Sequence, residues 1–282
     1  MASLKKIKMD LKTVSIIGSL TRTYQEIAQL KMMKIRQDVL ITRNFLNELA
    51  KIYHLVKKSY IFFFKKKWTF VEKKNDTVIV FLSANEFFYG TLILDIWALV
   101  QEYLKKSKNK IDLVIIGKLG RYLVENSGFQ EKIFYFELDD EKPGKEGIKT
   151  IIDFIKNYEK IIVFHGKFET VLNQVPTMTD ISGGPFFEEE GKETKRYLFE
   201  PSPEQIFEFF ETEISTNLFH QTILEHKLAR YAARMMAMYQ ASENAKKMKR
   251  DLEKDKIKLE KETTDKKQVE IFSGFKLWSK KV

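Results

Sequence analysis

The stretch EQIFEFFETEISTNLFHQTILEHKLARYAARMMAMYQASENAKKMKRDLEKDKIKLEKETTDKKQVEIFS, residues 204–273, contains neither glycine nor proline. Glycine and proline cost about 1 and 3 kcal/mol in a helix interior and loops nearly always use them, so this stretch predicts one uninterrupted helix. Ser202 as N-cap and Pro203 at the first helical position mark its start, and Gly274 marks its expected end. At 1.5 Å per residue the helix would be on the order of 105 Å long and would project from any compact domain formed by the remaining chain.

A second long helix is predicted at the start of the chain, where apolar residues recur alternately every three and four positions from Leu4 to Val56. This period of 3.5 residues is typical of a coiled-coil seam, and Gly18, Thr21 and Gln25 interrupt it. Neither long helix can leave its seam in water, because each buried apolar side chain contributes roughly 1.5 to 3 kcal/mol. The two ends of the chain are therefore expected to pair as an antiparallel coiled coil. The predicted seam comprises Leu4, Ile7, Leu11, Val14, Met32, Ile35, Leu228, Tyr231, Met235, Met238, Met248 and Leu252.

Between the two helices, short runs rich in β-branched and aromatic residues alternate with helix-like spans. Strands are predicted at 77–82, 112–116, 132–136 and 160–164, further strands at 167–175 and 196–200, and helices near 92–105, 121–126 and 148–158. Strands that are apolar on both faces, with helices between them, indicate a mainly parallel, Rossmann-like α/β sheet. The predicted domains are a coiled-coil helix at 1–59, a connector at 60–75, an α/β body at 76–201, and a long coiled-coil helix with an apolar tip at 202–282.

The composition limits the classes of function. The chain has 282 residues, no cysteine and a formal net charge of +10. Without cysteine there are no disulfides, thiol nucleophiles or thiolate zinc sites. Of the 49 basic residues only eight are arginine, which favours a solvated surface over a nucleic-acid site because arginine reads bases and holds phosphate. A basic coiled-coil module that binds nucleic acid stays the alternative function, motivated by this charge and by the aromatic and lysine cluster at 60–68.

No catalytic constellation is found in the sequence. The exit of the first predicted strand reads Ser83-Ala84-Asn85-Glu86-Phe87-Phe88-Tyr89-Gly90, which contains no phosphate-binding glycine loop. The four histidines form no metal-ligating pair, and Asp139-Asp140-Glu141 before Pro143 indicates a turn. We therefore expect no catalytic residue, no cofactor and no metal. A nucleotide-dependent enzyme, the third hypothesis, would require a nucleotide bound in the α/β body.

Several stretches resemble, in the right order, the gamma-subunit family of the F-type rotary ATP synthases. The resemblance is most specific at 197–202, at 225–245 and at the ending 270–274, and it extends to 4–8, 20–36, 112–121 and the turn at 174–177. The chain departs from the family pattern at 84–89, after the first predicted strand, and at 260–266. It is therefore identified as a divergent member.

The resemblance implies a central rotor shaft that transmits torque between a membrane ion-translocating ring and a catalytic hexamer, and that is itself non-catalytic. The implied partners are the alpha and beta subunits, the epsilon subunit and the membrane c-ring, with no nucleic acid. No run approaches the roughly 18 apolar residues of a spanning helix, so we expect the chain to meet a membrane only through partners. The resemblance implies a peripheral location at the cytoplasmic face of the plasma membrane. The resemblance also implies foot contacts at Tyr197, Phe199 and Glu200, and an apolar bearing tip at Ile271, Phe272, Phe275, Leu277 and Trp278. The hexamer would cover this tip; the alternative is that it folds back onto the body.

Overall fold

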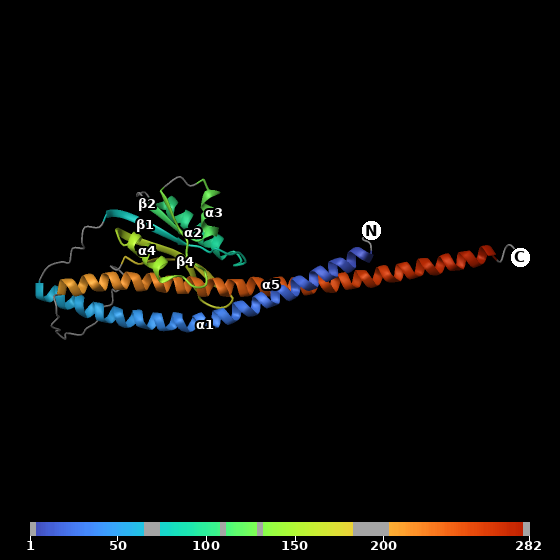
Figure 1. Cartoon of the computed structure of the whole chain (residues 1–282), viewed down its shortest axis with the longest axis horizontal. Helices are drawn as coiled ribbons and strands as arrows, with labels where there is room; N and C mark the ends of the chain where they lie inside the picture. Colours follow the sequence, from blue (N-terminus) through green and yellow to red (C-terminus); the bar gives the residue numbers. More distant parts are fainter. Residues whose placement is uncertain (1–3, 65–73, 108–110, 129–131, 183–202, 279–282) are drawn as a thin grey trace. The chain divides into compact units, whose positions relative to one another are not determined.

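The computed structural model describes residues 4–64, 74–107, 111–128, 132–182 and 203–278 (Figure 1). The elements in chain order are α1 (Leu4–Phe64), β1 (Lys74–Leu82), α2 (Leu92–Lys106), β2 (Ile111–Ile116), α3 (Lys118–Glu125), β3 (Ile133–Phe136), α4 (Lys145–Ile155), β4 (Tyr158–Phe168), β5 (Gln174–Asp180) and α5 (Pro203–Trp278). They form two compact units, one of residues 1–27 with 235–282 and the other of residues 28–234. Helices α1 and α5 each contribute to both units.

The larger unit contains a five-stranded sheet in the order β3-β2-β1-β4-β5. The first four of these strands are parallel, and β5 runs antiparallel to β4. In the central strand β1, all residues from Val78 to Leu82 are buried, because helices cover both faces of the sheet. The predicted α/β fold between two long terminal helices is confirmed.

The sequence predicted a separate strand at 167–175, and this prediction is wrong. The first two residues of this segment end β4, residues 169–173 form the turn, and β5 begins at Gln174. Two backbone hydrogen bonds between Thr170 and Asn173 close this turn, at 3.1 and 3.3 Å. Residues 167–175 therefore span the turn of a hairpin between two strands. The strand predicted at 196–200 lies outside the described residues.

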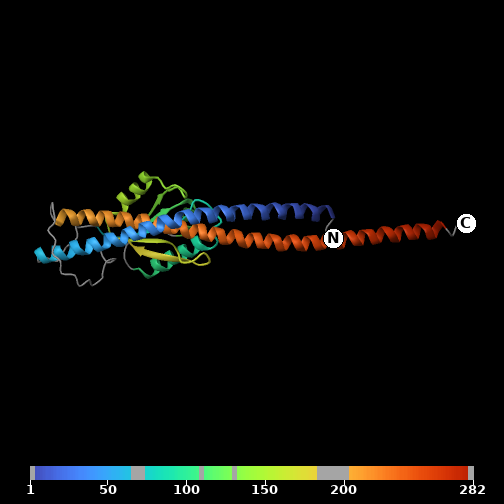
Figure 2. The same ribbon diagram turned by 90° about the horizontal axis from the view of Figure 1, so that it is seen from below.

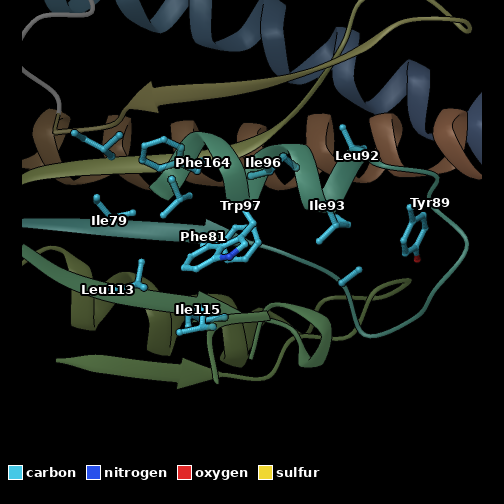
Figure 3. Close-up of a cluster of buried hydrophobic side chains, with 14 of the residues drawn as sticks. Ile79, Phe81, Tyr89, Leu92, Ile93, Ile96, Trp97, Leu113, Ile115 and Phe164 are labelled. Carbon is cyan, nitrogen blue, oxygen red and sulfur yellow. The ribbon is translucent and has the colours of Figure 1, made fainter. Parts of the chain in front are cut away.

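Apolar side chains form one cluster on each face of the sheet. On one face, Ile151 and Ile155 of α4 and Phe219 of α5 pack against the strands, together with Leu46 of α1. On the other face, α2 supplies Ile93, Ile96, Trp97 and Val100 (Figure 3). The rings of Trp97 and Phe81 stack there with centroids 5.5 Å apart. Burial of such side chains contributes roughly 1.5 to 3 kcal/mol each, so both faces stabilise the sheet.

Helices α1 and α5 run side by side and antiparallel within each unit (Figures 1 and 2). In the larger unit the Arg43 guanidinium lies 2.6 Å from the Glu225 carboxylate, and the Lys31 ammonium lies 5.7 Å from the ring centroid of Tyr231. In the smaller unit, a Cβ placed on Gly18 would lie 3.5 Å from that of Ala245. As the residue number on α1 rises, its partner on α5 falls, which confirms the antiparallel pairing.

The C-terminal ends of α1 and α5 both differ from the predicted boundaries. Helix α1 continues to Phe64, five residues past the predicted end of the first segment, and α5 continues through Gly274 to Trp278. Gly274 was predicted to end the helix, but one exposed glycine in a helix costs only about 1 kcal/mol and does not by itself stop it. Within the described residues, no helix combines the length and the apolar content that crossing a membrane requires.

Two glycines are expected to respond to alanine in opposite directions. A Cβ at Gly18 would make ordinary contact, so Gly18→Ala should raise the free energy of unfolding by about 0.5 to 1 kcal/mol through helix propensity. A Cβ at Gly166 would lie only 3.2 Å from that of Ala229 on α5, so Gly166→Ala should lower it by about 1 to 3 kcal/mol. Urea denaturation of the purified chain measures both changes, and two changes of the same sign would contradict this packing.

Candidate functional site

Two loops at the carboxyl edge of the sheet meet helix α5, and we call this region the α5 junction. It comprises the loop 83–91 after β1, the loop 137–144 after β3, and residues 225–234 of α5, all in the larger unit. Ligands of open α/β sheets bind at this edge, so the chemistry of the junction determines what the fold can do.

Asp140 connects all three parts of the α5 junction. Its Oδ2 accepts hydrogen bonds from the backbone N–H groups of Asn85 at 2.9 Å and Glu86 at 3.3 Å. Its Oδ1 accepts a hydrogen bond from Nη1 of Arg230 at 2.5 Å, and only 8% of the Arg230 side chain and 13% of the Asp140 side chain are exposed. Asn85 ties the two loops together a second time, because its Nδ2 donates to the backbone oxygen of Leu138 at 2.7 Å.

Arg234 holds the loop after β1 through a second set of contacts. Its Nη2 lies 2.5 Å from the Glu86 carboxylate and 3.3 Å from the backbone oxygen of Phe87. The guanidinium of Arg234 lies 4.3 Å from the ring centroid of Tyr89, and that of Arg230 lies 5.4 Å from it. Burial raises the pKa of Tyr89 to about 12, with the carboxylates of Asp140 and Glu86 acting in the same direction and the two arginines opposing them. Tyr89 is therefore a neutral phenol close to two cations.

His226 of α5 bonds to the backbone of strand β4 and of the first residue after strand β1. Its Nδ1 accepts a hydrogen bond from the backbone N–H of Gly166 at 3.0 Å, so the proton resides on Nε2, which donates to the backbone oxygen of Ser83 at 3.0 Å. Burial holds the pKa of His226 well below its ordinary value, and the Arg230 charge lowers it further. The imidazole is thus neutral and acts as a structural link between α5, β1 and β4.

The loop after β1 has no geometry suited to phosphate. Phe87 and Phe88 are 64% and 65% exposed, and Phe88 has a φ of 73°, a value that bulky residues rarely adopt. The cavity beside this loop, bounded by Ser83, Gly117 and Arg230 among others, has a volume of about 20 Å³. Ligand pockets measure roughly 300 Å³ or more, so this cavity cannot hold a nucleotide. Within the described residues, no group of three or more His, Asp or Glu side chains could hold a metal ion.

The comparisons with known proteins give the family. A family model described as ATP synthase matches residues 3–276. The chain belongs to this ATP synthase family. Curated relatives include the ATP synthase gamma chain of Bdellovibrio bacteriovorus, 24% identical over 97% of this chain and 98% of the relative, and that of Roseiflexus sp. strain RS-1, 22% identical over 97% and 98%. The resemblance to gamma subunits is confirmed, and the low identity makes this a divergent member.

Solved structures with a similar fold belong to ATP synthase rotors. The rotor of Euglena gracilis mitochondrial ATP synthase matches with a TM-score of 0.62 at 14% identity, over 93% of this chain and 98% of that chain. The central stalk and c-ring structure of Tetrahymena thermophila mitochondrial ATP synthase contains a chain that matches with a TM-score of 0.58 at 16% identity, over 79% of this chain and 99% of that chain. At these identities the likeness concerns the fold.

In this ATP synthase family member, most of the residues predicted to form the coiled-coil seam are buried or half-buried. Every position of the α1 repeat from Leu4 to Leu49 is buried or half-buried. Buried members of the seam are Ile7, Val14, Met32, Ile35, Leu228, Tyr231 and Met238, and half-buried members are Leu4, Leu11, Met235 and Leu252. Met248 was placed wrongly, since it is 57% exposed. On α5, Ser242 is buried and Ala245, Leu252 and Leu259 are half-buried, whereas every residue from 246 to 251, Met248 included, is exposed.

The tip and foot residues are only partly within the described structure. Ile271 and Phe272 lie on α5 and are 60% and 74% exposed. Phe275, Leu277 and Trp278 are helical, but their side chains lie outside what the structure describes. The foot residues Tyr197, Phe199 and Glu200 also lie outside the described residues.

Sequence reasoning missed the α5 junction. It read the acidic run at 139–141 as turn chemistry, which fits Asp139, because this carboxylate accepts the backbone N–H groups of Glu141 and Lys142 at 2.7 Å each. It did not identify Asp140 as a partner of α5. A usable signal was present: Arg230 and Arg234 lie four residues apart within an otherwise apolar part of the helix, and buried cations require partners.

The free energy of unfolding is expected to fall as the pH drops below about 6.5, the ordinary pKa of histidine. His226 stays neutral in the folded chain because its pKa is depressed, whereas the unfolded chain binds a proton there, so acid favours the unfolded state. Burial also lowers the pKa of His165 and His220, which act in the same direction. Denaturation midpoints at a series of pH values measure the slope. His226→Gln should make it shallower, and a wild-type profile that stays flat below pH 6.5 would refute the assignment.

Removal of the Asp140 carboxylate should destabilise the larger unit strongly. Asp140→Ala leaves the Arg230 guanidinium buried without its charge partner, which costs about 3 to 5 kcal/mol in comparable buried pairs. Asp153→Ala is the matched control, since it removes an aspartate from an exposed pair with Lys156 and should change stability little. Chemical denaturation compares the two variants, and equal losses would mean that the Arg230–Asp140 pair behaves like a surface pair.

Proposed function

We propose that this chain is the central shaft of a rotary ATP synthase, which transmits torque between a membrane ion-translocating ring and a catalytic hexamer without performing chemistry itself. The observation that carries the proposal is α5, one continuous helix of 76 residues that belongs to both compact units. Such a helix is about 110 Å long at 1.5 Å per residue. Its uninterrupted backbone hydrogen bonds make it a stiff element through which a rotation at one unit reaches the other.

The family supports this function in its details. The relatives from Bdellovibrio and Roseiflexus are ATP synthase gamma chains, and they match nearly the whole length of this chain. The Tetrahymena structure is described as central stalk and c-ring, and a Euglena structure as OSCP, F1 and c-ring. Corresponding partners of this chain are the alpha and beta subunits, the epsilon subunit and the c-ring. Because the curated relatives include bacterial proteins, we place this chain peripherally at the cytoplasmic face of the plasma membrane.

The apolar end of α5 has a specific role in this proposal. Ile271 and Phe272 are large apolar side chains exposed at 60% and 74%. Contiguous apolar surface of this kind marks a binding site more often than free surface. We assign them, with Phe275, Leu277 and Trp278, to contact with the surrounding hexamer, which would form an apolar bearing around the helix end. In the same way, Tyr197, Phe199 and Glu200 are assigned to contacts at the membrane ring.

The alternative of a nucleic-acid-binding module receives no support. Its motivation was the net charge and the aromatic and lysine cluster at 60–68, part of which lies outside the described residues. The relatives and the structural neighbours named above are all ATP synthase components.

The proposal predicts that an affinity-tagged copy of this chain co-purifies with alpha and beta subunits and that its end is needed for coupling. Truncation after Leu259 removes the apolar tip and should abolish most ATP synthesis by membrane vesicles, because the helix end loses its bearing. Truncation after Trp278 is the control and should preserve synthesis. Absence of alpha and beta subunits from the purified material would overturn the proposed function, and full coupling in the shorter variant would overturn the role of the tip.

A further inference from the structure

If the proposed function is right, something must prevent α5 from rotating about its own axis at the α5 junction. The following inference rests on that function. Helix α5 packs on the sheet largely through small and apolar side chains, including Ala229, Ala233 and Phe219. Apolar contact is non-directional and depends mainly on the area removed from water. A helix held only by such contacts resists separation from the sheet better than it resists rotation about its own axis. A shaft under torque needs directional contacts as well.

His226 supplies two directional contacts, its hydrogen bonds with Gly166 and Ser83, and Arg230 and Arg234 supply further ones. The two arginines lie four residues apart, so their side chains leave α5 on the same face. Both reach the loop after β1, where their guanidiniums lie 5.4 and 4.3 Å from the ring centroid of Tyr89. Each also forms a charge-assisted hydrogen bond of 2.5 Å, Arg230 with Asp140 and Arg234 with Glu86. Such bonds have fixed geometry and are roughly twice as strong as neutral ones.

The position of these bonds suits them to oppose rotation. Side chains place their ends about 5 to 6 Å from a helix axis, so a bond at that radius acts with a lever arm that backbone contacts near the axis lack. The two acceptors come from different parts of the sheet domain, because Glu86 follows β1 and Asp140 follows β3. Asp140 also accepts the backbone N–H groups of Asn85 and Glu86, which ties both loops together. Any rotation of α5 would therefore strain both loops at once.

Stability alone does not explain this arrangement. Burying an ion pair costs desolvation, and apolar residues of similar volume often stabilise a protein equally well. Within the described residues, the buried Nε atoms of Arg230 and Arg234 have no hydrogen-bond partner, which adds to the cost. The loop that the arginines hold also keeps Phe88 at a φ of 73°, and such backbone strain costs of order 1 to 3 kcal/mol. A chain selected for stability alone would not retain three such features at one place.

We propose that Arg230, Arg234, Tyr89 and Asp140 form a torque-bearing joint that locks α5 against rotation relative to the α/β body. These are positioning residues: they touch no nucleotide and act by keeping the shaft and the body in one angular register. Rotation delivered to the body by the membrane ring then reaches α5 without slip. The joint matters when the shaft works against a load and is dispensable when it turns freely.

The test uses the complete ATP synthase in membrane vesicles with this chain carrying Arg230→Met or Arg234→Met. ATP hydrolysis in the presence of an ionophore reports unloaded turnover, and ATP synthesis driven by an imposed ion gradient reports loaded turnover. Per assembled complex, hydrolysis should stay near the wild-type rate. Synthesis should fall about fivefold or more, the lower end of the usual range for energetic coupling between distant sites. Arg234→Lys, which keeps the ion pair with Glu86, should retain most of the synthesis rate.

Arg121→Met on α3 is the matched control. Arg121 also pairs with a glutamate, Glu125, and lies 5.0 Å from a tyrosine ring centroid, that of Tyr135, but its ion pair is exposed at 59% and 53%. It does not belong to the α5 junction, so synthesis should be unchanged. If Arg230→Met prevents assembly, the synthesis rate of Arg234→Met tests the proposal by itself, since this variant leaves the Arg230–Asp140 pair intact.

Two results would overturn the joint. One is a loss of synthesis that merely follows the amount of assembled complex, which would indicate a role in folding alone. The other is unchanged synthesis in both arginine variants. Failure of the proposed function looks different, because the wild-type vesicles would then lack this chain in their ATP synthase, or would synthesise ATP equally well without it.

Discussion

The fold depends on the burial of one helix on several sides at once. Between Leu218 and Arg234, every residue of α5 except His220 is buried or half-buried, since the sheet covers one side of the helix and α1 covers another. A helix that is covered all round belongs to the core. The sheet and α1 therefore share a single partner, and the α/β body has its place in the larger unit because it packs on the same helix that pairs with α1.

The sequence predicted what depends on local pattern. The 3.5-residue repeat of α1 matches the buried positions up to Leu49, and the four parallel strands lie close to their predicted places, because burial on one or both faces determines which residue types recur. The predictions of the helix ends and of the β4–β5 hairpin were less accurate, since single residues such as Gly274 do not determine where an element ends. One seam position on α5 was predicted wrongly, because Met248 fits the repeat by its apolar side chain but lies in a stretch, 246–251, that is exposed throughout.

The α5 junction could not be derived from spacing. Arg230 and Asp140 are 90 positions apart in the chain, and Arg234 and Glu86 are 148 positions apart. Periodicity identifies which face of a helix is apolar, but it does not identify the partner of a buried charge. Such partners depend on how the loops at a sheet edge are folded. The family identity and the residues of the junction are therefore separate findings, one from similarity over the whole chain and the other from geometry.

His226 has a further practical consequence. Its ring proton on Nε2 is fixed by two backbone partners, Gly166 and Ser83, and the side chain is 3% exposed. Exchange of that proton with solvent requires α5 to separate from the ends of the strands. Nitrogen-15 and proton NMR of this imidazole would therefore report directly whether helix and sheet stay in contact, which gives the shaft a built-in spectroscopic probe that needs only isotopic enrichment.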